Sequence, residues 1–105
     1  MKLSNTWRIY VALKLVLRDE ALKDIERAFY WYEEQSPGLG NRFADEVLVF
    51  LKFIETNPLG YQIKFKNYRE AVLKVFPFVI IYEVGELEAV VYSVFQTSKS
   101  PTKKP

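Results

Sequence analysis

The spacing of the apolar residues changes twice along this chain, and that pattern constrains the fold more than any other feature. Two neighbouring stretches, about 19–36 and 39–56, carry apolar residues at the spacing of one helix face. The stretches before and after them alternate apolar and polar residues, which is typical of strands. Between the helical stretches stands Ser36-Pro37-Gly38, which favours a turn because proline lacks the backbone N–H. The predicted order is therefore a strand, a helical hairpin and several strands.

The first helix is predicted to have Asp19 as its N-cap, with Glu20 next to it at the positive end of the helix dipole. Its predicted buried stripe consists of Leu22, Ile25, Phe29 and Tyr32. We expect its solvated face to carry Glu26, Glu33 and Glu34. The second helix is predicted over about 39–56 and ends at Asn57-Pro58, because the residue before a proline avoids the helical region. Its predicted buried stripe consists of Leu39, Phe43, Val47, Phe50, Leu51 and Ile54.

Five stretches have strand character. The first covers about 8–17, where a helix is the alternative. An edge strand with solvated lysines is predicted around 61–66. Three more strands are predicted at 71–76, 78–84 and 88–95, with turns at Pro77 and Gly85-Glu86 between them. Strands joined by such short turns are antiparallel neighbours. Because the helices are grouped in the chain, they should cover one face of the sheet, and the fold class is α+β.

The composition excludes several classes of site. A chain of 105 residues fits one domain, for which we expect a core over about 10–101 and a flexible tail over 102–105. The absence of cysteine and histidine excludes disulfides, thiolate or imidazole metal sites and histidine-based catalysis, so we expect no metal and no cofactor. The net charge of +2 does not by itself indicate nucleic-acid binding. No apolar run approaches the ~20 residues that cross a bilayer, so we expect a cytoplasmic protein without a membrane partner.

An ordered set of short segments resembles a known family. The set comprises 21–25, 30–40, 76–82 and 94–101, together with Phe43, Glu46-Val47, Ile54, Asn57-Pro58 and Arg69. These segments resemble the ParE/RelE toxin superfamily, on its ParE-like (plasmid stabilisation) side, over nearly the whole chain. Two positions depart from the family's pattern. Gln96 stands where many relatives carry histidine, and Lys99 stands where they carry arginine shortly before the final proline.

The resemblance implies the toxin of a type II toxin–antitoxin pair, neutralised by a small antitoxin. ParE-like members poison DNA gyrase by protein contact, whereas RelE-like members cut messenger RNA on the ribosome. A decayed toxin that only binds antitoxin is a third hypothesis, so whether the chain is an enzyme stays open at this stage. The aromatic residues and apolar sheet edges are also compatible with a homodimer.

Ribonuclease chemistry would need a base, an acid and positive charge beside the phosphate. The candidates for these roles are Arg69, Lys74, Tyr82 and Lys99. The simpler interpretation, which we favour, makes Arg69 and Lys74 solvated charges on an exposed sheet face. A tight cationic cluster on the sheet would favour the ribonuclease, and an aromatic face without such a cluster would favour protein binding.

Six residues are candidates for contact with a partner: Trp31, Arg69, Phe78, Tyr82, Tyr92 and Gln96. Tyr82, Tyr92 and Gln96 share the same parity within their strands, so one hypothesis places them on one face of the sheet, open to a partner. Packing in the core is the alternative that we favour. An exposed Trp31 would indicate an interface, because aromatic side chains anchor binding sites. The alternative for Trp31 is contact with the second helix, and the segment Phe76-Pro77-Phe78 is expected to be a packed turn.

Overall fold

The computed structural model describes residues 14–97. Its elements are β1 (Lys14–Leu17), α2 (Asp19–Gln35), α3 (Leu39–Thr56), β2 (Ile63–Phe65), β3 (Tyr68–Val72), β4 (Phe78–Val84) and β5 (Glu88–Gln96). This order confirms the predicted α+β class. Residues 8–13 of the predicted first strand, Lys99 and the predicted tail lie outside the described residues.

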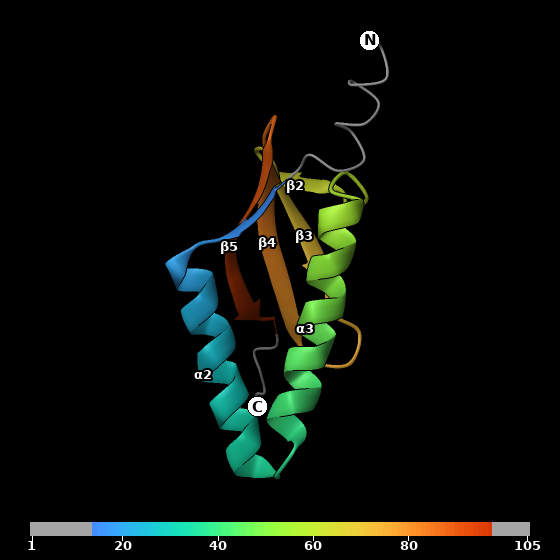
Figure 1. The fold of residues 1–105 in the computed structure, drawn as a ribbon. Helices are drawn as coiled ribbons and strands as arrows, with labels where there is room; N and C mark the ends of the chain where they lie inside the picture. Colours follow the sequence, from blue (N-terminus) through green and yellow to red (C-terminus); the bar gives the residue numbers. More distant parts are fainter. Residues whose placement is uncertain (1–13, 98–105) are drawn as a thin grey trace.

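The five strands form one sheet in the order β1-β5-β4-β3-β2. The last four strands of the chain are antiparallel neighbours, as the short turns predicted. The sheet as a whole is mixed, because β1 pairs with β5 in the parallel direction. The connection from β1 to the other strands runs through the helical hairpin, which lies on one side of the sheet (Figure 1).

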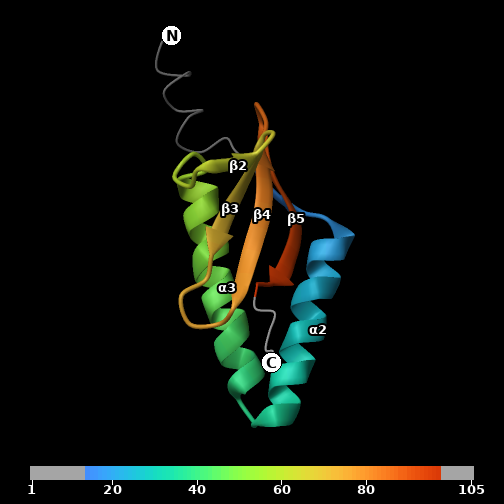
Figure 2. The same cartoon turned by 180° about the vertical axis from the view of Figure 1, so that it is seen from behind.

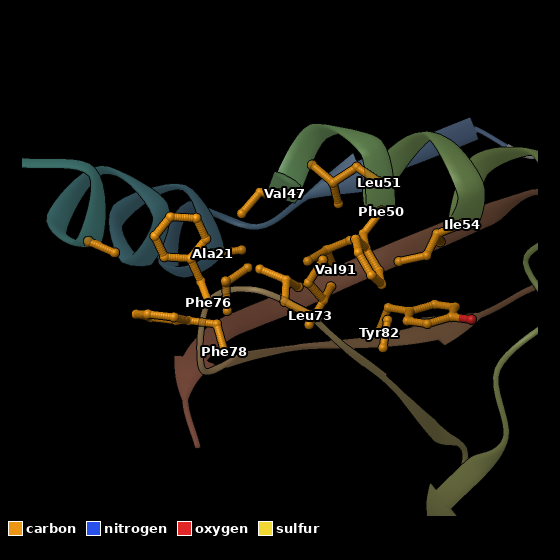
Figure 3. Close-up of a cluster of buried hydrophobic side chains, with 14 of the residues drawn as sticks. Ala21, Val47, Phe50, Leu51, Ile54, Leu73, Phe76, Phe78, Tyr82 and Val91 are labelled. Atoms are coloured by element: carbon orange, nitrogen blue, oxygen red, sulfur yellow. The ribbon is translucent and has the colours of Figure 1, made fainter. Parts of the chain in front are cut away.

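The core lies between this hairpin and the sheet (Figure 3). The predicted stripe of α3 is confirmed, since its members are buried or, for Leu39, partly buried against the core. Phe43 is fully buried, and its ring centroid lies 5.0 Å from that of Phe78 and 5.4 Å from that of Phe76. The predicted packed turn around Pro77 is confirmed by the burial of these two rings.

The start and the buried side of α2 differ from the prediction. Arg18 occupies the N-cap position without a side-chain hydrogen bond, and Asp19 is the first helical residue. Leu22 is 50% exposed, whereas Ala21 and Ala28 are buried. These small side chains allow α2 to lie close to β5. The face of α2 that contacts the sheet is therefore rotated from the stripe of larger apolar residues that the sequence predicted.

The third strand of the predicted set also has different bounds. β3 ends at Val72, and the segment after it bonds to α3 instead of continuing the sheet. The carboxylate of Glu46 accepts hydrogen bonds from the backbone N–H groups of Lys74, Val75 and Phe76 at 2.8, 2.9 and 3.1 Å. Three consecutive amides aimed at one side chain cannot also face a neighbouring strand, which is why the predicted strand 71–76 is wrong.

Glu33 joins the two helices and is not a solvated charge as predicted. Its carboxylate accepts hydrogen bonds from the N–H groups of Gly38 and Gly40, both at 2.9 Å. These N–H groups lie at the start of α3, where a carboxylate also interacts favourably with the helix dipole. Gly38 has a positive φ of 89°, and a Cβ added at Gly40 would lie 2.6 Å from the carbonyl oxygen of Phe29. The turn therefore needs both glycines and the carboxylate.

Candidate functional site

One face of the sheet carries no helix within the described part of the chain, and we call it the open face (Figure 2). The register and the alternation of burial place ten residues of β3, β4 and β5 on it: Tyr68, Glu70, Val72, Val79, Ile81, Glu83, Val90, Tyr92, Ser93 and Phe95. Most of these side chains are half-buried. The fold therefore leaves a continuous surface on the side opposite the helices.

The end of the open face where β3 and β5 end and β4 begins is apolar. Val72, Val79 and Phe95 are neighbours in register across β3, β4 and β5. Val79 is only 3% exposed, whereas Val72 is 56% exposed and Phe95 is 48% exposed. Two large apolar side chains thus flank a buried one and present apolar area to the solvent, as binding surfaces do.

The opposite end of the open face, where β3 begins and β4 ends, is aromatic and acidic. A β-bulge in β5 places Tyr92 there. Ile81 pairs with Ser93 while Tyr82 pairs with Val91, so Tyr92 is the extra residue of β5. The hydroxyl of Tyr92 donates a hydrogen bond to Glu83 at 2.9 Å, and this bond is the largest cause that raises the pKa of Tyr92. A bulge increases local twist and changes where a side chain points, which is common beside functional sites.

Two more groups meet the ring of Tyr92. The ring of Tyr68 approaches it edge to face, with 5.4 Å between centroids. The guanidinium carbon of Arg18 lies 5.4 Å from the centroid of the Tyr92 ring, within the range of a cation–π contact. We call Tyr68, Glu70, Glu83 and Tyr92 the tyrosine–glutamate cluster.

The bulge also overturns the prediction that Tyr82, Tyr92 and Gln96 share one face. Tyr82 points toward the helices and is fully buried. Gln96 pairs with Phe78, whose buried side chain also faces the helices, so Gln96 lies on that side. Tyr92 is on the open face. One inserted residue reverses the parity of every position beyond it, which the sequence pattern does not reveal.

Tyr82 serves the core. Its hydroxyl donates a hydrogen bond to the carbonyl oxygen of Pro58 at 2.8 Å. Burial raises the pKa of Tyr82 above its ordinary value, and the positive charge of Arg69 opposes that shift in part. The phenol therefore stays protonated at neutral pH and has no access to a phosphate group on the open face.

The Tyr82→Phe variant is expected to lose about 1–3 kcal/mol of unfolding free energy, because the partly buried carbonyl of Pro58 loses its donor. The raised pKa adds a pH dependence. The folded state holds the Tyr82 proton more tightly than the unfolded state, so this contribution is complete below the unfolded pKa of 10.0 and is lost as the pH rises through the folded pKa. Urea titrations from pH 8 upward should show a smaller decline in the variant than in the wild type. An equal decline would contradict the assignment.

The candidate catalytic residues do not gather on the open face. Arg69 is the register partner of Tyr82, faces the helix side and donates a hydrogen bond to the carbonyl of Tyr61 at 2.5 Å. Lys74 is exposed in the loop after β3 and belongs to no strand. The favoured prediction of solvated charges on an exposed sheet face is therefore wrong for Arg69, and for Lys74 it is right about the solvent exposure but wrong about the sheet. Lys99 lies outside the described residues.

The remaining partner candidates line a groove between α2 and β5. Its volume is about 410 Å³, and its lining includes Trp31, Phe78 and Gln96, together with Phe95 at the edge of the open face. Trp31 is 57% exposed, so contact with α3 does not cover it. Phe78 is buried and forms part of the groove wall. Exposed aromatic area therefore continues from α2 to the apolar end of the open face.

Within this groove, the carboxylate of Asp24 takes the place of a neighbouring strand at the edge of β5. β1 pairs with Glu88–Val91 only, and the N–H of Val94 further along donates instead to the Asp24 carboxylate at 3.0 Å. Arg27 forms an ion pair with the same carboxylate at 2.7 Å. The sequence offered no signal for this contact, because the two partners are 70 positions apart. Residues 14–97 contain no helix suited to crossing a membrane and no cluster of potential metal ligands.

Comparison with known proteins agrees with this architecture. The family described as "ParE toxin of type II toxin-antitoxin system, parDE" matches residues 15–101. The fold is similar to that of a solved chain from the chromosomal ParDE TA system of P. aeruginosa, with a TM-score of 0.75 and 14% identity over 83% of this chain and 98% of that chain. It is also similar to a conserved hypothetical protein, HP0894, from Helicobacter pylori, with a TM-score of 0.51 and 22% identity over 80% and 93% of the two chains. The search of curated protein sequences found no match.

At these identities the two solved structures show the fold alone. The family match is the stronger finding, because it spans all the described elements except the first residue of β1. It also covers every segment that resembles the ParE/RelE superfamily. The chain belongs to the ParE toxin family of type II toxin–antitoxin systems.

Proposed function

We propose that this toxin acts by protein–protein contact, with DNA gyrase as its target, and that its cognate antitoxin neutralises it by covering its surface. One observation carries the choice of contact over RNA cleavage: among the described residues, those suited to ribonuclease chemistry do not meet on the open face. Arg69 and Tyr82 are engaged on the helix side of the sheet, and Lys74 lies in a separate loop.

The open face supports the same choice. One end of it brings Glu83 together with two tyrosine rings, and Glu70 lies on the same face of β3. Arg18 is already placed over Tyr92, and Lys14 stands opposite Glu88 in register. A ribonuclease needs positive charge where the transition state develops negative charge. Carboxylates and tyrosines suit a polypeptide surface better than a phosphate backbone.

Induced expression in a bacterial host tests this function. We expect growth arrest with a DNA-damage response, while messenger RNA stays intact, because a poisoned gyrase leaves broken DNA. Purified toxin should inhibit gyrase-catalysed supercoiling in a titratable way. Ribosome-dependent cleavage of messenger RNA would reject the proposal in favour of the ribonuclease, and normal growth would favour the decayed toxin.

The location and the oligomeric state are part of the same proposal. A target such as gyrase places the toxin in the cytoplasm. Ile63 and Phe65 of the edge strand β2 are 50% and 65% exposed, which is compatible with a homodimer through that edge. Sedimentation velocity of the toxin alone distinguishes a dimer from a monomer.

A further inference from the structure

We infer that the open face binds an antitoxin segment that places a lysine or arginine on the tyrosine–glutamate cluster and an aliphatic side chain between Val72 and Phe95. This inference deepens the proposed function and rests on it. To the proposed neutralisation by an antitoxin it adds which side chains the antitoxin segment carries and where each of them binds on the toxin. Two independent features of the open face carry it, one at each end.

The first feature is the tyrosine–glutamate cluster. Tyr68 and Glu83 are register partners on β3 and β4, and Glu70 is the next residue of β3 on the same face. Tyr92 joins them through its hydrogen bond to Glu83 and its contact with Tyr68. Two carboxylates and two aromatic rings in one place form a site with the chemistry that attracts a cation.

One cation of the chain already contacts an aromatic ring of the cluster. The guanidinium of its own Arg18 lies 5.4 Å from the centroid of the Tyr92 ring. Glu70 and Glu83 still leave the cluster with one negative charge more than Arg18 balances. Lys14, on the same side, faces Glu88 across β1 and β5. A basic side chain of the antitoxin would therefore find complementary charge at this end of the face.

The second feature is the apolar end of the same face. Val72 and Phe95 expose about half of their surface on either side of the buried Val79. Tyr68 and Val72 are four residues apart on β3, which corresponds to about 13 Å along a strand. A partner segment that runs along the strands would therefore carry its basic and aliphatic residues about four positions apart if extended, or about nine positions apart if helical.

The test uses the full-length toxin and, as the probe, the antitoxin encoded by the gene adjacent to the toxin gene. The variant Glu70→Gln/Glu83→Gln removes both charges, and glutamine can still accept the hydrogen bond from Tyr92. We expect its Kd for the antitoxin to rise on the order of tenfold at low salt, with a weaker dependence on salt than the wild type. The variant Phe95→Ser should raise the Kd without changing the salt dependence.

The matched control is Glu34→Gln/Glu55→Gln, which removes two exposed charges from the outer sides of α2 and α3. It should leave the Kd and its salt dependence unchanged. Calorimetric titration measures all the variants, and their melting temperatures confirm that they are folded. A Glu70→Gln/Glu83→Gln variant that binds as the wild type does would overturn the inference while leaving the proposed function intact.

Two other outcomes are also decisive. If the double variant changes gyrase inhibition but not antitoxin affinity, the cluster serves the target and the assignment to the antitoxin is wrong. If the wild-type toxin does not bind the antitoxin at all, the proposed neutralisation fails together with the inference. A rise in Kd confined to the open-face variants supports the inference.

Discussion

The Phe43→Ala variant should lose about 3–5 kcal/mol of unfolding free energy, because it removes a fully buried ring from the centre of the core. The ring centroid of Phe43 lies 5.0 to 5.4 Å from those of Tyr32, Phe76 and Phe78. Its loss leaves a cavity where the helical hairpin meets the sheet. Since small domains are stable by about 5–15 kcal/mol, much of the total would be lost.

Urea denaturation followed by circular dichroism measures this change. The control is Phe43→Leu, which keeps most of the apolar volume and should cost less than about 1.5 kcal/mol. Equal losses in the two variants would show that the ring contacts contribute little. A loss below about 1 kcal/mol in the alanine variant would contradict the placement of Phe43 at the centre of the core.

The Glu46→Ala variant should lose about 2 kcal/mol, because three backbone N–H groups lose one charged acceptor. Water can reach the amides of Lys74 and Val75, which limits the loss, but the amide of Phe76 is partly buried. The loop also holds the ring of Phe76 at 4.8 Å from that of Tyr32, so its loosening should disturb the core.

Hydrogen exchange locates the effect of this variant. The amides of residues 74–76 should exchange faster in Glu46→Ala than in the wild type, while the amides at the centre of α3 keep their protection. Glu55→Ala, at an exposed residue directly before the last residue of α3, is the control and should change stability by less than about 0.5 kcal/mol. Unchanged exchange at 74–76 would show that the carboxylate does not hold the loop.

The helices were predictable because their information is local. α3 has the predicted bounds, since a regular apolar stripe and Asn57-Pro58 define its extent. The start of α2 was less certain in physical terms, because Asp19 suits both the N-cap and the first turn, where its charge also interacts with the dipole. The packing of α2 on the sheet is defined by the small residues Ala21 and Ala28 and not by its large apolar residues, because a helix and a sheet approach most closely at small side chains.

The errors in the sheet come from contacts between distant residues. The segment 71–76 has the composition of a strand, but Glu46, nearly thirty positions earlier, takes its amides. The parallel pairing of β1 with β5 could not be read from β1, because no short turn links the two strands. The bulge at Tyr92 separates it from Tyr82, and no residue type in β5 marks the insertion.

The candidate site was only partly predictable for the same reason. The family resemblance led to the correct family, and the exposure of Trp31 agrees with its role as an interface candidate. The tyrosine–glutamate cluster depends on the cross-strand register of β3 and β4 and on the bulge in β5. Register across a sheet is set by packing on both faces, so sequence alone identified Tyr92 but not its partners.

The most direct test of the account maps the antitoxin onto the toxin by NMR chemical-shift changes. Titration with the antitoxin should shift the amides of β3, β4 and β5 beside Tyr68, Glu83 and Phe95, while the amides on the outer side of α3 around Lys52 and Glu55 stay unchanged. Shifts confined to the outer sides of the helices, with the open face unaffected, would contradict it.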